Sequence, residues 1–477
     1  MATVTTSIGT NTSIDTEVPS SGSGSNLYTV TFGTDPTGVS VGDSVHFDNG
    51  MGTVYVYLVT NISGSNYTLK WISGGMGATN PYGIVDMSYS QASGVFKRTY
   101  STISAWESDL DNTSYYSSSD DAIGEVYNDS VFDEQVIIES GGTVGLSSVK
   151  LTAPESERHD GTEGNGARIE YTGSSTNSFV LKINNVTVEF LEFDLSSAGS
   201  GVSAGMVIGT NAEQNVFVQN CIIHDLVTQS NHIHGLYIGG NSDTPTSRHA
   251  LNNIIYNIDN SSTSKEAMGL TVETPNQDVY VYNNTVYYVK TTYFTRYAYC
   301  FNIKEADVYA RNNIGARAIA TLSSRMDCFG KLNGAQWSNV DHDYDLLSDT
   351  AGSEDLHLKT GADAIGAGVD LGTSPTGVNI DIDGRDRDGE GDTWDIGADQ
   401  TAVTVVIAPD PPANASITGT AHADLHAVAP LNAGITGTAH ADLHSVIPVN
   451  AGITAAAHAD LHAVQPVNAG ITATTVT

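Results

Sequence analysis

Five segments between residues 186 and 316 repeat one pattern: a short run of β-branched and aromatic residues, a polar or asparagine pair, and a second short apolar run. Four copies align on an asparagine, and these asparagines are 32, 31 and 29 residues apart: Asn220, Asn252, Asn283 and Asn312. No helical periodicity lies between the copies. A period of about 30 residues made of strands and turns is typical of a solenoid, in which each repeat is one coil stacked on the last.

Each copy also predicts the internal structure of a coil. Side chains in a strand alternate between two faces, so one row of apolar residues points inward and forms the core. Asparagine tolerates the left-handed backbone of a tight corner and bonds to neighbouring backbone groups. We therefore expect the four aligned asparagines at equivalent corners, where they can stack as an internal ladder.

This coil pattern resembles that of the right-handed parallel β-helix of the pectate-lyase-like and tailspike-like type, and the match extends from about residue 95 to residue 400. The resemblance implies an all-β chain with a right-handed parallel β-helix over residues 130–400. It implies little about chemistry, because one fold carries many unrelated activities.

Two flanking segments fit a solenoid with closed ends. Ser104-Ala-Trp-Glu107 has the form of a capping box and predicts a short helix through Leu110, in a linker over residues 93–129, that covers the first coil. The acidic segment 380–399 resembles the ending of many bacterial and phage β-helix proteins, in which Asp-x-Asp-Gly-Arg precedes Asp-Ile-Gly-Ala. We expect this segment to form a closing loop at which the solenoid stops.

Residues 1–92 have a different pattern. Four short strand-like runs alternate with Gly, Asp, Asn and Ser turns and predict a small β-barrel or sandwich. The segment Val41-Gly-Asp-Ser-Val-His-Phe47, with the later Tyr67-Thr-Leu69, resembles small β-domains that recur in phage virion proteins. That resemblance implies an attachment role for this unit.

Residues 401–477 contain a near-identical array. The hexapeptide Ala-His-Ala-Asp-Leu-His begins at Ala421, Ala439 and Ala457, each 18 residues after the last. The array predicts short strands with Pro and Asn-Ala-Gly turns. One copy has too few large apolar residues to fold alone, so we expect the array to continue a solenoid or to be buried between chains, with a homotrimer favoured. Such repeats resemble those of phage and phage-like structural proteins.

The composition excludes several kinds of partner. The 54 acidic and 19 basic residues give a net charge of −35, which argues against nucleic acid and against an anionic membrane. No apolar run is long enough to span a bilayer, and the first residues lack the basic and apolar regions of a signal peptide. We therefore expect a protein made in the host cytoplasm and released by lysis. The three cysteines form neither a disulfide framework nor a zinc motif.

The acidic segment is a candidate calcium site. Asp381, Asp383, Asp386 and Asp388 offer hard oxygen ligands to Ca²⁺, and no other cofactor is predicted. The segment departs from the EF-hand pattern because Gly397 stands where the bidentate glutamate is required. The alternative is a polar closing loop without a metal.

The C-terminal array is a candidate transition-metal site. Histidines and aspartates that alternate along a strand point to one side, and a column of them could bind a metal if three chains met on an axis. The residues of this column are His422, Asp424, His426, His440, Asp442, His444, His458, Asp460 and His462. The alternative is that they form the solvated face of the strands.

The solenoid also offers carboxylates for catalysis. Glu189, Asp194 and Asp225 lie on strands, and a pair of them in a groove between coils could cleave a polysaccharide. The alternative is that they are solvated side chains on the outer face. No lysine or arginine clusters with them, as a lyase acting on uronates requires, so an enzyme is the weaker prediction.

Together these patterns predict a structural component of a tailed-phage virion, either a fibre or spike or a protein that decorates the particle. Its role would be display and contact with the host surface, and its partners other virion proteins and a host cell-surface glycan. Two alternatives remain open: a polysaccharide-degrading tailspike enzyme and a bacterial surface adhesin.

Overall fold

The computed structural model confirms an all-β chain built around a parallel β-solenoid of about six turns. It describes residues 2–9, 13–24, 27–48, 53–73, 93–208, 215–229, 232–240, 247–262, 265–273, 278–292, 296–304, 308–321, 326–331, 336–341, 346–348, 355–359, 362–388, 393–401, 414–418, 423–427, 431–437, 441–445, 449–455, 459–463 and 468–473. No helix in these ranges is long and apolar enough to cross a bilayer.

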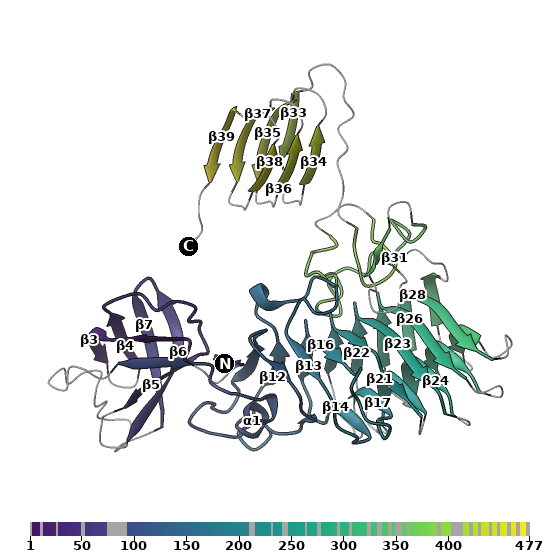
Figure 1. Ribbon diagram of the computed structural model, residues 1–477, viewed down its shortest axis with the longest axis horizontal. Coiled ribbons are helices and arrows are strands. Elements are labelled where there is room, and N and C mark those ends of the chain that lie inside the picture. The colour runs from purple at the N-terminus through teal and green to yellow at the C-terminus, as the bar shows by residue number, and fades with distance from the viewer. Residues whose placement is uncertain are drawn as a thin grey trace.

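Each coil contributes three strands to the solenoid (Figure 1). The first row of strands is β9 (Asp121–Val126), β12 (Ser148–Thr152), β15 (Val186–Glu189), β18 (Val216–Gln219), β22 (Ser247–Leu251), β25 (Asp278–Tyr282) and β28 (Val308–Ala320). The second row is β10 (Val131–Phe132), β13 (Arg168–Glu170), β16 (Glu192–Asp194), β19 (Ile222–His224), β23 (Ile254–Asn260) and β26 (Thr285–Thr291), and it joins the first row at β28. The third row is a separate sheet of β11 (Val136–Ile138), β14 (Asn177–Leu181), β17 (Ala204–Ile208), β21 (Ile233–Gly239), β24 (Ala267–Glu273), β27 (Ala298–Ile303) and β29 (Met326–Lys331).

The core follows from the register of these strands. Neighbouring coils pair in parallel, so residues at the same place in successive coils stack directly over one another. In the first row the inward positions are occupied by Val188, Val218, Ala250, Val281 and Ala310, and all are buried. The alternation predicted from the sequence therefore produces a continuous apolar column along the axis.

The asparagine corners lie between the first and second rows. Asn220, Asn252, Asn283 and Asn312 all have φ between +52° and +57°, as the left-handed corner requires. The side chains of Asn252, Asn283 and Asn312 form one ladder: the Asn283 amide donates to Asn252 Oδ1 at 2.9 Å, and the Asn312 amide donates to Asn283 Oδ1 at 3.1 Å.

A second ladder, which the sequence analysis did not anticipate, uses the next residue of each corner. Asn253, Asn284 and Asn313 are fully buried. Asn284 Oδ1 accepts from the backbone N–H of Asn253 at 3.1 Å, and the Asn284 amide donates to the carbonyl of Ala250 in the preceding coil at 2.9 Å. Cys221 holds the same place one coil earlier, and its Sγ donates to the carbonyls of Val188 and Gln219.

The closing segment, residues 362–388 and 393–401, lies along the side of the coils (Figure 1). It was expected to end the solenoid, but it docks on the first asparagine ladder. Asn252 donates to the carbonyl of Gly377 at 3.0 Å, and Asn283 donates to the carbonyl of Val378 at 2.9 Å. Apolar residues of the segment, including Ile382 and Ile396, belong to one buried cluster with Ile222, Ile254 and Ile314 of the coils. At such a corner the first asparagine therefore bonds the closing segment, as Asn252 does, and the second bonds the neighbouring coil, as Asn253 does.

The predicted capping helix exists with a different cap. It is α1 (Ile103–Ser108), and the hydroxyl of Thr102, rather than that of Ser104, accepts from the backbone N–H of Ala105 at 3.1 Å. The carboxylate of Glu134 accepts from the N–H groups of Ile103 and Ser104 at 2.7 and 2.9 Å. A carboxylate distant in sequence therefore completes the helix N-terminus, which a local capping-box pattern does not reveal.

The N-terminal residues divide between two sheets. Strand β1 (Thr3–Ile8) pairs in parallel with β9 and so extends the first row of the solenoid. The remaining strands form a seven-stranded antiparallel, barrel-like sheet with its own aromatic core. In sheet order they are β2 (Asp15–Glu17), β8 (Gly94–Lys97), β5 (Ser44–Asp48), β6 (Val54–Ser63), β7 (Asn66–Ser73), β4 (Leu27–Phe32) and β3 (Pro19–Gly24).

The C-terminal array forms two small parallel sheets with an 18-residue register, in which Asn432 pairs with Asn450 and Asp424 pairs with Asp442. One sheet contains β33 (Asn414–Thr418), β35 (Leu431–Gly437), β37 (Val449–Ala455) and β39 (Asn468–Ala473); the other contains β34 (Ala423–Ala427), β36 (Ala441–Ser445) and β38 (Ala459–Ala463). The Asn-Ala-Gly phrases were expected in turns, but they lie within strands. Stacking identical copies supplies backbone partners on both sides, and this outweighs the weak strand propensity of Asn and Gly.

Four further strands lie in the described residues. Strand β20 (Val227–Thr228) pairs with β23, and β30 (Gln336–Asp341) pairs with β28. Strands β31 (Leu346–Ser348) and β32 (Asp355–Leu358) form an antiparallel pair.

The second ladder yields a stability prediction. Asn284→Leu removes the acceptor for the Asn253 N–H and the donor for the Ala250 carbonyl, and each buried polar group left without a partner costs about 1–3 kcal/mol. We expect the thermal midpoint to fall clearly in a melt followed by circular dichroism. Cys221→Asn is the matched control, because it places an amide where the ladder lacks one, and its midpoint should stay equal or rise. An equal midpoint for Asn284→Leu would contradict the role of the ladder.

Candidate functional site

The candidate site lies on the outward side of the second row of strands. The parallel register stacks Glu170, Asp194, His224, Tyr256 and Tyr287 in one column across five coils. The ring of His224 lies on that of Tyr256, with 5.1 Å between centroids and 8° between planes. This column changes from acidic to aromatic along the axis, and His224 stands where the change occurs.

Both ring nitrogens of His224 are bonded to carboxylates. Nε2 lies 3.0 Å from Glu192 Oε1 in the preceding coil, and Nδ1 lies 3.0 Å from Asp225 Oδ2. The His224 side chain is only 3% exposed. Asp225 has a φ of +60° at the end of its strand, which turns its carboxylate back toward the ring, and Asn257 of the next coil donates to that carboxylate.

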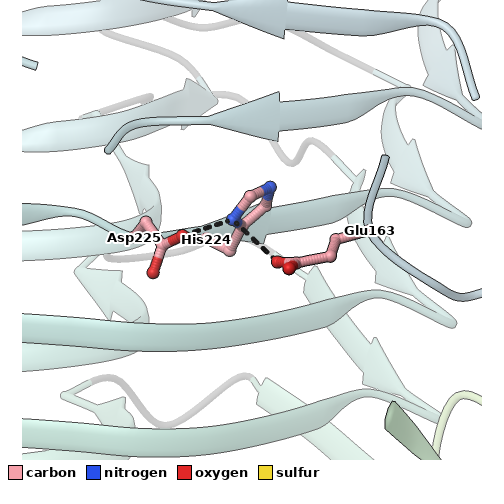
Figure 2. Close-up of side chains that lie close together, drawn as sticks. All are labelled: Glu163, His224 and Asp225. Atoms are coloured by element: carbon pink, nitrogen blue, oxygen red, sulfur yellow. Dashed lines mark hydrogen bonds and ion pairs between the residues drawn. The ribbon is translucent and has the colours of Figure 1, made fainter. Parts of the chain in front are cut away.

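A loop from outside the column completes the cluster. Residues 153–167, which connect β12 and β13 and include the 3₁₀ turn Glu155–Glu157, bring Glu163 beside the ring. Glu163 Oε2 lies 3.8 Å from His224 Nδ1 and accepts from the Tyr256 hydroxyl at 2.5 Å. Figure 2 shows Glu163 and Asp225 approaching the same ring nitrogen from opposite sides.

The electrostatics of the cluster favour a charged histidine. Burial alone would lower the pKa of His224, but the hydrogen bonds to Asp225 and Glu192 and the charges of both carboxylates raise that pKa to about 10. Burial likewise opposes ionisation of Asp225, and its bond to His224 nevertheless lowers the pKa of that carboxyl. At neutral pH the site is therefore an imidazolium held between carboxylates.

This charge state limits what the cluster can bind. One ligand atom from each of Glu163, His224 and Asp225 falls within 4.8 Å of the others, a spacing compatible with a metal ion. A metal binds the lone pair of a neutral imidazole, so it would have to displace a proton from His224, whose pKa is raised. The hydrogen bonds to Glu192 and Asp225 are those of an ion-pair network.

The carboxylates of Glu163 and Asp225 are the reachable part of the cluster, with side chains 28% and 25% exposed. Their oxygens lie within 4.8 Å of one another. A pair of carboxyl groups about 5 Å apart is the arrangement used for retaining glycoside hydrolysis. The cluster could thus provide a carboxylate nucleophile and an acid, with the His224 imidazolium stabilising the negative charge of Asp225.

Two of the three predicted catalytic carboxylates are not solvated, which corrects the expectation of an exposed outer face. Glu189 is buried, bonded to Lys150 Nζ at 2.5 Å and to the Gln219 amide at 2.8 Å. Asp194 is also buried, and its carboxylate accepts from the Ser196 N–H at 2.9 Å. In a stacked solenoid an outward side chain is enclosed by the coils on both sides and by the segments laid over them. Of the three predicted residues, Asp194 lies next to His224 in the column, and Asp225 alone bonds the His224 ring.

Each of the four predicted calcium ligands is bonded to another group of the protein. Asp381 accepts from the N–H groups of Asp383 and Arg385, and burial and the neighbouring Asp383 raise its pKa. Asp386 accepts from the Asn379 amide, and Asp388 accepts from the Trp394 indole. Asp383 is paired with His357 at 3.1 Å. Calcium binding here stays a prediction.

The predicted transition-metal column can be followed only in its backbone. The register aligns Asp424, Asp442 and Asp460, and also His426, His444 and His462. The remaining members lie outside the described residues: His422, His440 and His458. This metal site also stays a prediction.

A second outward column lies on the first row of strands. Phe217, His249, Tyr280 and Tyr309 occupy the same place in four successive coils. Their rings stack face to face, with centroids 4.0, 4.9 and 5.3 Å apart in that order. We call this set the aromatic column.

Sequence reasoning missed Glu163, His224 and Tyr256. Glu163 has no local signal, because only the fold of its loop brings it to the coils. His224 did have one: His224-Asp225 stands where the next copies have Tyr256-Asn257 and Tyr287-Tyr288. Identical or similar residues stack best at one position of a repeat, so ionisable residues at a position that is aromatic in the next copies are a signal of a site.

Comparisons with known proteins supply no family for this chain. No protein-family model matches it, and no curated protein matches it. Among solved structures, pectin methylesterase from Aspergillus niger in deglycosylated form has 12% identity and a TM-score of 0.28, covering 57% of this chain and 89% of its own. Tailspike protein gp49 from Pseudomonas phage LKA1 has 12% identity and a TM-score of 0.18, covering 97% and 65%. The catalytic domain of a GH87 alpha-1,3-glucanase has 9% identity and a TM-score of 0.14, covering 96% and 89%. At these TM-scores no function passes from them to this chain.

The cluster predicts a pair of compensating substitutions. His224→Phe leaves the buried Glu192 carboxylate without its cation and should lower the free energy of unfolding by about 3–5 kcal/mol. The double variant His224→Phe with Glu192→Leu removes both charges and should recover most of that loss. Denaturant titration of all three proteins measures the difference. A double variant as unstable as the single one would contradict the ion-pair account.

The raised pKa of His224 predicts a pH dependence. A group whose pKa is higher in the folded state stabilises fully below its unfolded value of about 6.5, and this stabilisation is lost as the pH rises through the folded value. The stability of the wild-type protein relative to the double variant should therefore fall between pH 7 and about 10. Denaturation midpoints of both proteins measured across that range test the sign, and a relative stability that rises with pH would overturn it.

Proposed function

We propose that the chain is a rigid display element of a tailed-phage virion, a fibre, spike or decorating protein, whose solenoid side contacts the host-cell surface. The observation that carries this proposal is the aromatic column. The rings of Phe217, Tyr280 and Tyr309 are partly exposed beside the closing segment, and His249 is buried between them. These rings are already ordered, so a partner that contacts them pays little conformational entropy. Rings with polar edges suit contacts with sugars and with other proteins.

The rest of the chain fits this role as spacer and attachment. The ladders and the closing segment hold the coils in a fixed stack. The barrel-like N-terminal sheet has its own core, so it can serve as a separate unit that binds another virion protein. We propose that the C-terminal array joins copies of the chain, with a homotrimer favoured. The net charge of −35 suits neither nucleic acid nor an anionic membrane as partner.

Immunogold electron microscopy tests the location. Antibodies raised against the whole chain should label particles purified from a lysate of cells that make the protein, in the same pattern on each particle. Label confined to the surface of the bacteria, with unlabelled particles, would contradict the virion proposal and favour the adhesin alternative.

Analytical ultracentrifugation tests the assembly. Deleting residues 411–477 should lower the oligomeric mass, while the far-ultraviolet circular dichroism of the solenoid is kept. An unchanged mass for the truncated protein would show that the array does not join the chains.

The exposed pair Glu163 and Asp225 favours one alternative, a polysaccharide-cleaving enzyme. Reducing ends released from purified host capsule by the whole chain would support it. Glu163→Gln with Asp225→Asn should then abolish the release. Glu170→Gln should not, because Glu170 is a partly exposed acid two coils before His224 and outside the pair. Under the display proposal the wild-type protein releases no more reducing ends than the double variant.

A further inference from the structure

The aromatic column ends abruptly at one face of Phe217. His249 covers the other face of that ring at a centroid distance of 4.0 Å and an angle of 3°. In the preceding coil the equivalent place holds Thr187, and in the coil before that it holds Lys150. Coils are spaced by about 4.8 Å, so a small residue beside a ring leaves that ring face without an aromatic partner.

A groove opens at this end of the column. Its walls are Phe217 and five small polar residues, and its volume is about 420 Å³. The five are Ser147, Ser148, Thr187, Asn185 and Asn215. A second hollow of about 390 Å³ shares Ser148 and Asn185 with it and continues toward the turn at Gly141. Both hollows are open to solvent, and the first is the shallower of the two.

The polar groups of the groove are held in place by the fold. Asn185 and Asn215 both have a φ of +53°, and the Asn215 amide donates to Asn185 Oδ1 at 2.9 Å. The Ser247 hydroxyl donates to Asn215 Oδ1 at 2.9 Å. Among the described residues the Asn185 Nδ2 group has no acceptor, so its two hydrogens are available to a ligand.

None of the six residues that line the groove is ionisable. Two charged groups adjoin it: Asp121, whose carboxylate accepts from the Ser148 hydroxyl at 2.6 Å, and Lys150, which is paired with Glu189 at 2.5 Å. Burial lowers the pKa of His249 to about 4, so the ring behind Phe217 is neutral at pH 7. With a net charge of −35, the chain as a whole repels a polyanion.

We propose that this groove binds one neutral pyranose ring of a host-surface polysaccharide, with a C–H face of the sugar on Phe217 and its hydroxyls bonded to Asn185, Asn215 and Ser148. An aromatic face beside fixed amides and hydroxyls matches a ring that has one apolar face and a polar rim. The adjoining hollow takes the next sugar of the chain. The inference rests on the proposed function, in which the side of the solenoid meets the host surface.

Titration of the full-length chain tests the groove. The probes are neutral oligosaccharides built from glucose, galactose, mannose or rhamnose, with oligogalacturonate as the anionic comparison, and binding is followed by saturation-transfer NMR and calorimetry. At least one neutral probe should bind. Phe217→Leu, which keeps an apolar side chain but removes the ring face, and Asn215→Ala should each weaken binding about tenfold.

Tyr299→Leu is the matched control, because Tyr299 is a stacked tyrosine of β27 in the third row of strands, outside the aromatic column, and does not line the groove. It should bind the neutral probe as the wild-type protein does, and unchanged melting curves of all variants should exclude misfolding. Binding of a neutral probe that neither groove variant weakens would overturn the groove while the proposed function stands. Preference for oligogalacturonate, or no binding of any neutral probe, would overturn the neutral-sugar inference. Immunogold label confined to the surface of the bacteria, with unlabelled particles, would count against the proposed function itself.

Discussion

The in-register parallel pairing of the coils is the constraint on which the rest of the structure depends. With a spacing of about 4.8 Å, any residue type that recurs at one place in the repeat becomes a column of side chains in contact. Valine and alanine columns form the core, asparagine pairs form two hydrogen-bonded ladders, and Phe217 with its successors forms a stack of rings. The side chains that the solenoid presents therefore depend on which columns continue from coil to coil and on where the residue type within a column changes.

Both candidate sites lie where a column changes. The acidic members Glu170 and Asp194 give way to His224 and Tyr256, and the mismatch of charge is resolved by an imidazolium that bonds Glu192 and Asp225. The aromatic column stops at Thr187, and the missing ring leaves a groove. The closing segment also depends on a column, because it docks on corner asparagines whose amides donate to its carbonyl groups. Gly397 shows how close that docking is: it has a φ of +106°, and a Cβ there would lie 2.6 Å from Ile314 Cδ1.

The sequence predicts whatever depends on repetition and local geometry. The solenoid, its inward row and the left-handed corners at Asn220, Asn252, Asn283 and Asn312 all follow from a pattern with a period of about 30 residues. Contacts between segments without repetition could not be predicted in this way. Glu163 reaches His224 through the fold of one loop, and Glu134 caps the helix at Ile103 from another coil. The burial of Glu189 was missed for the same reason, because the pairing of its carboxylate with Lys150 depends on the register.

The central claim is that coil corners and closing segment form one cooperative unit, joined by the amides of the first ladder. Hydrogen–deuterium exchange of the full-length chain, read by mass spectrometry at peptide resolution, measures this most directly. The backbone N–H groups of Ile382, Ile396 and Gly397, which bond within the segment or to the Asn312 carbonyl, should exchange as slowly as those at the corners. Rapid exchange over residues 377–398, with the coil strands still protected, would contradict the account.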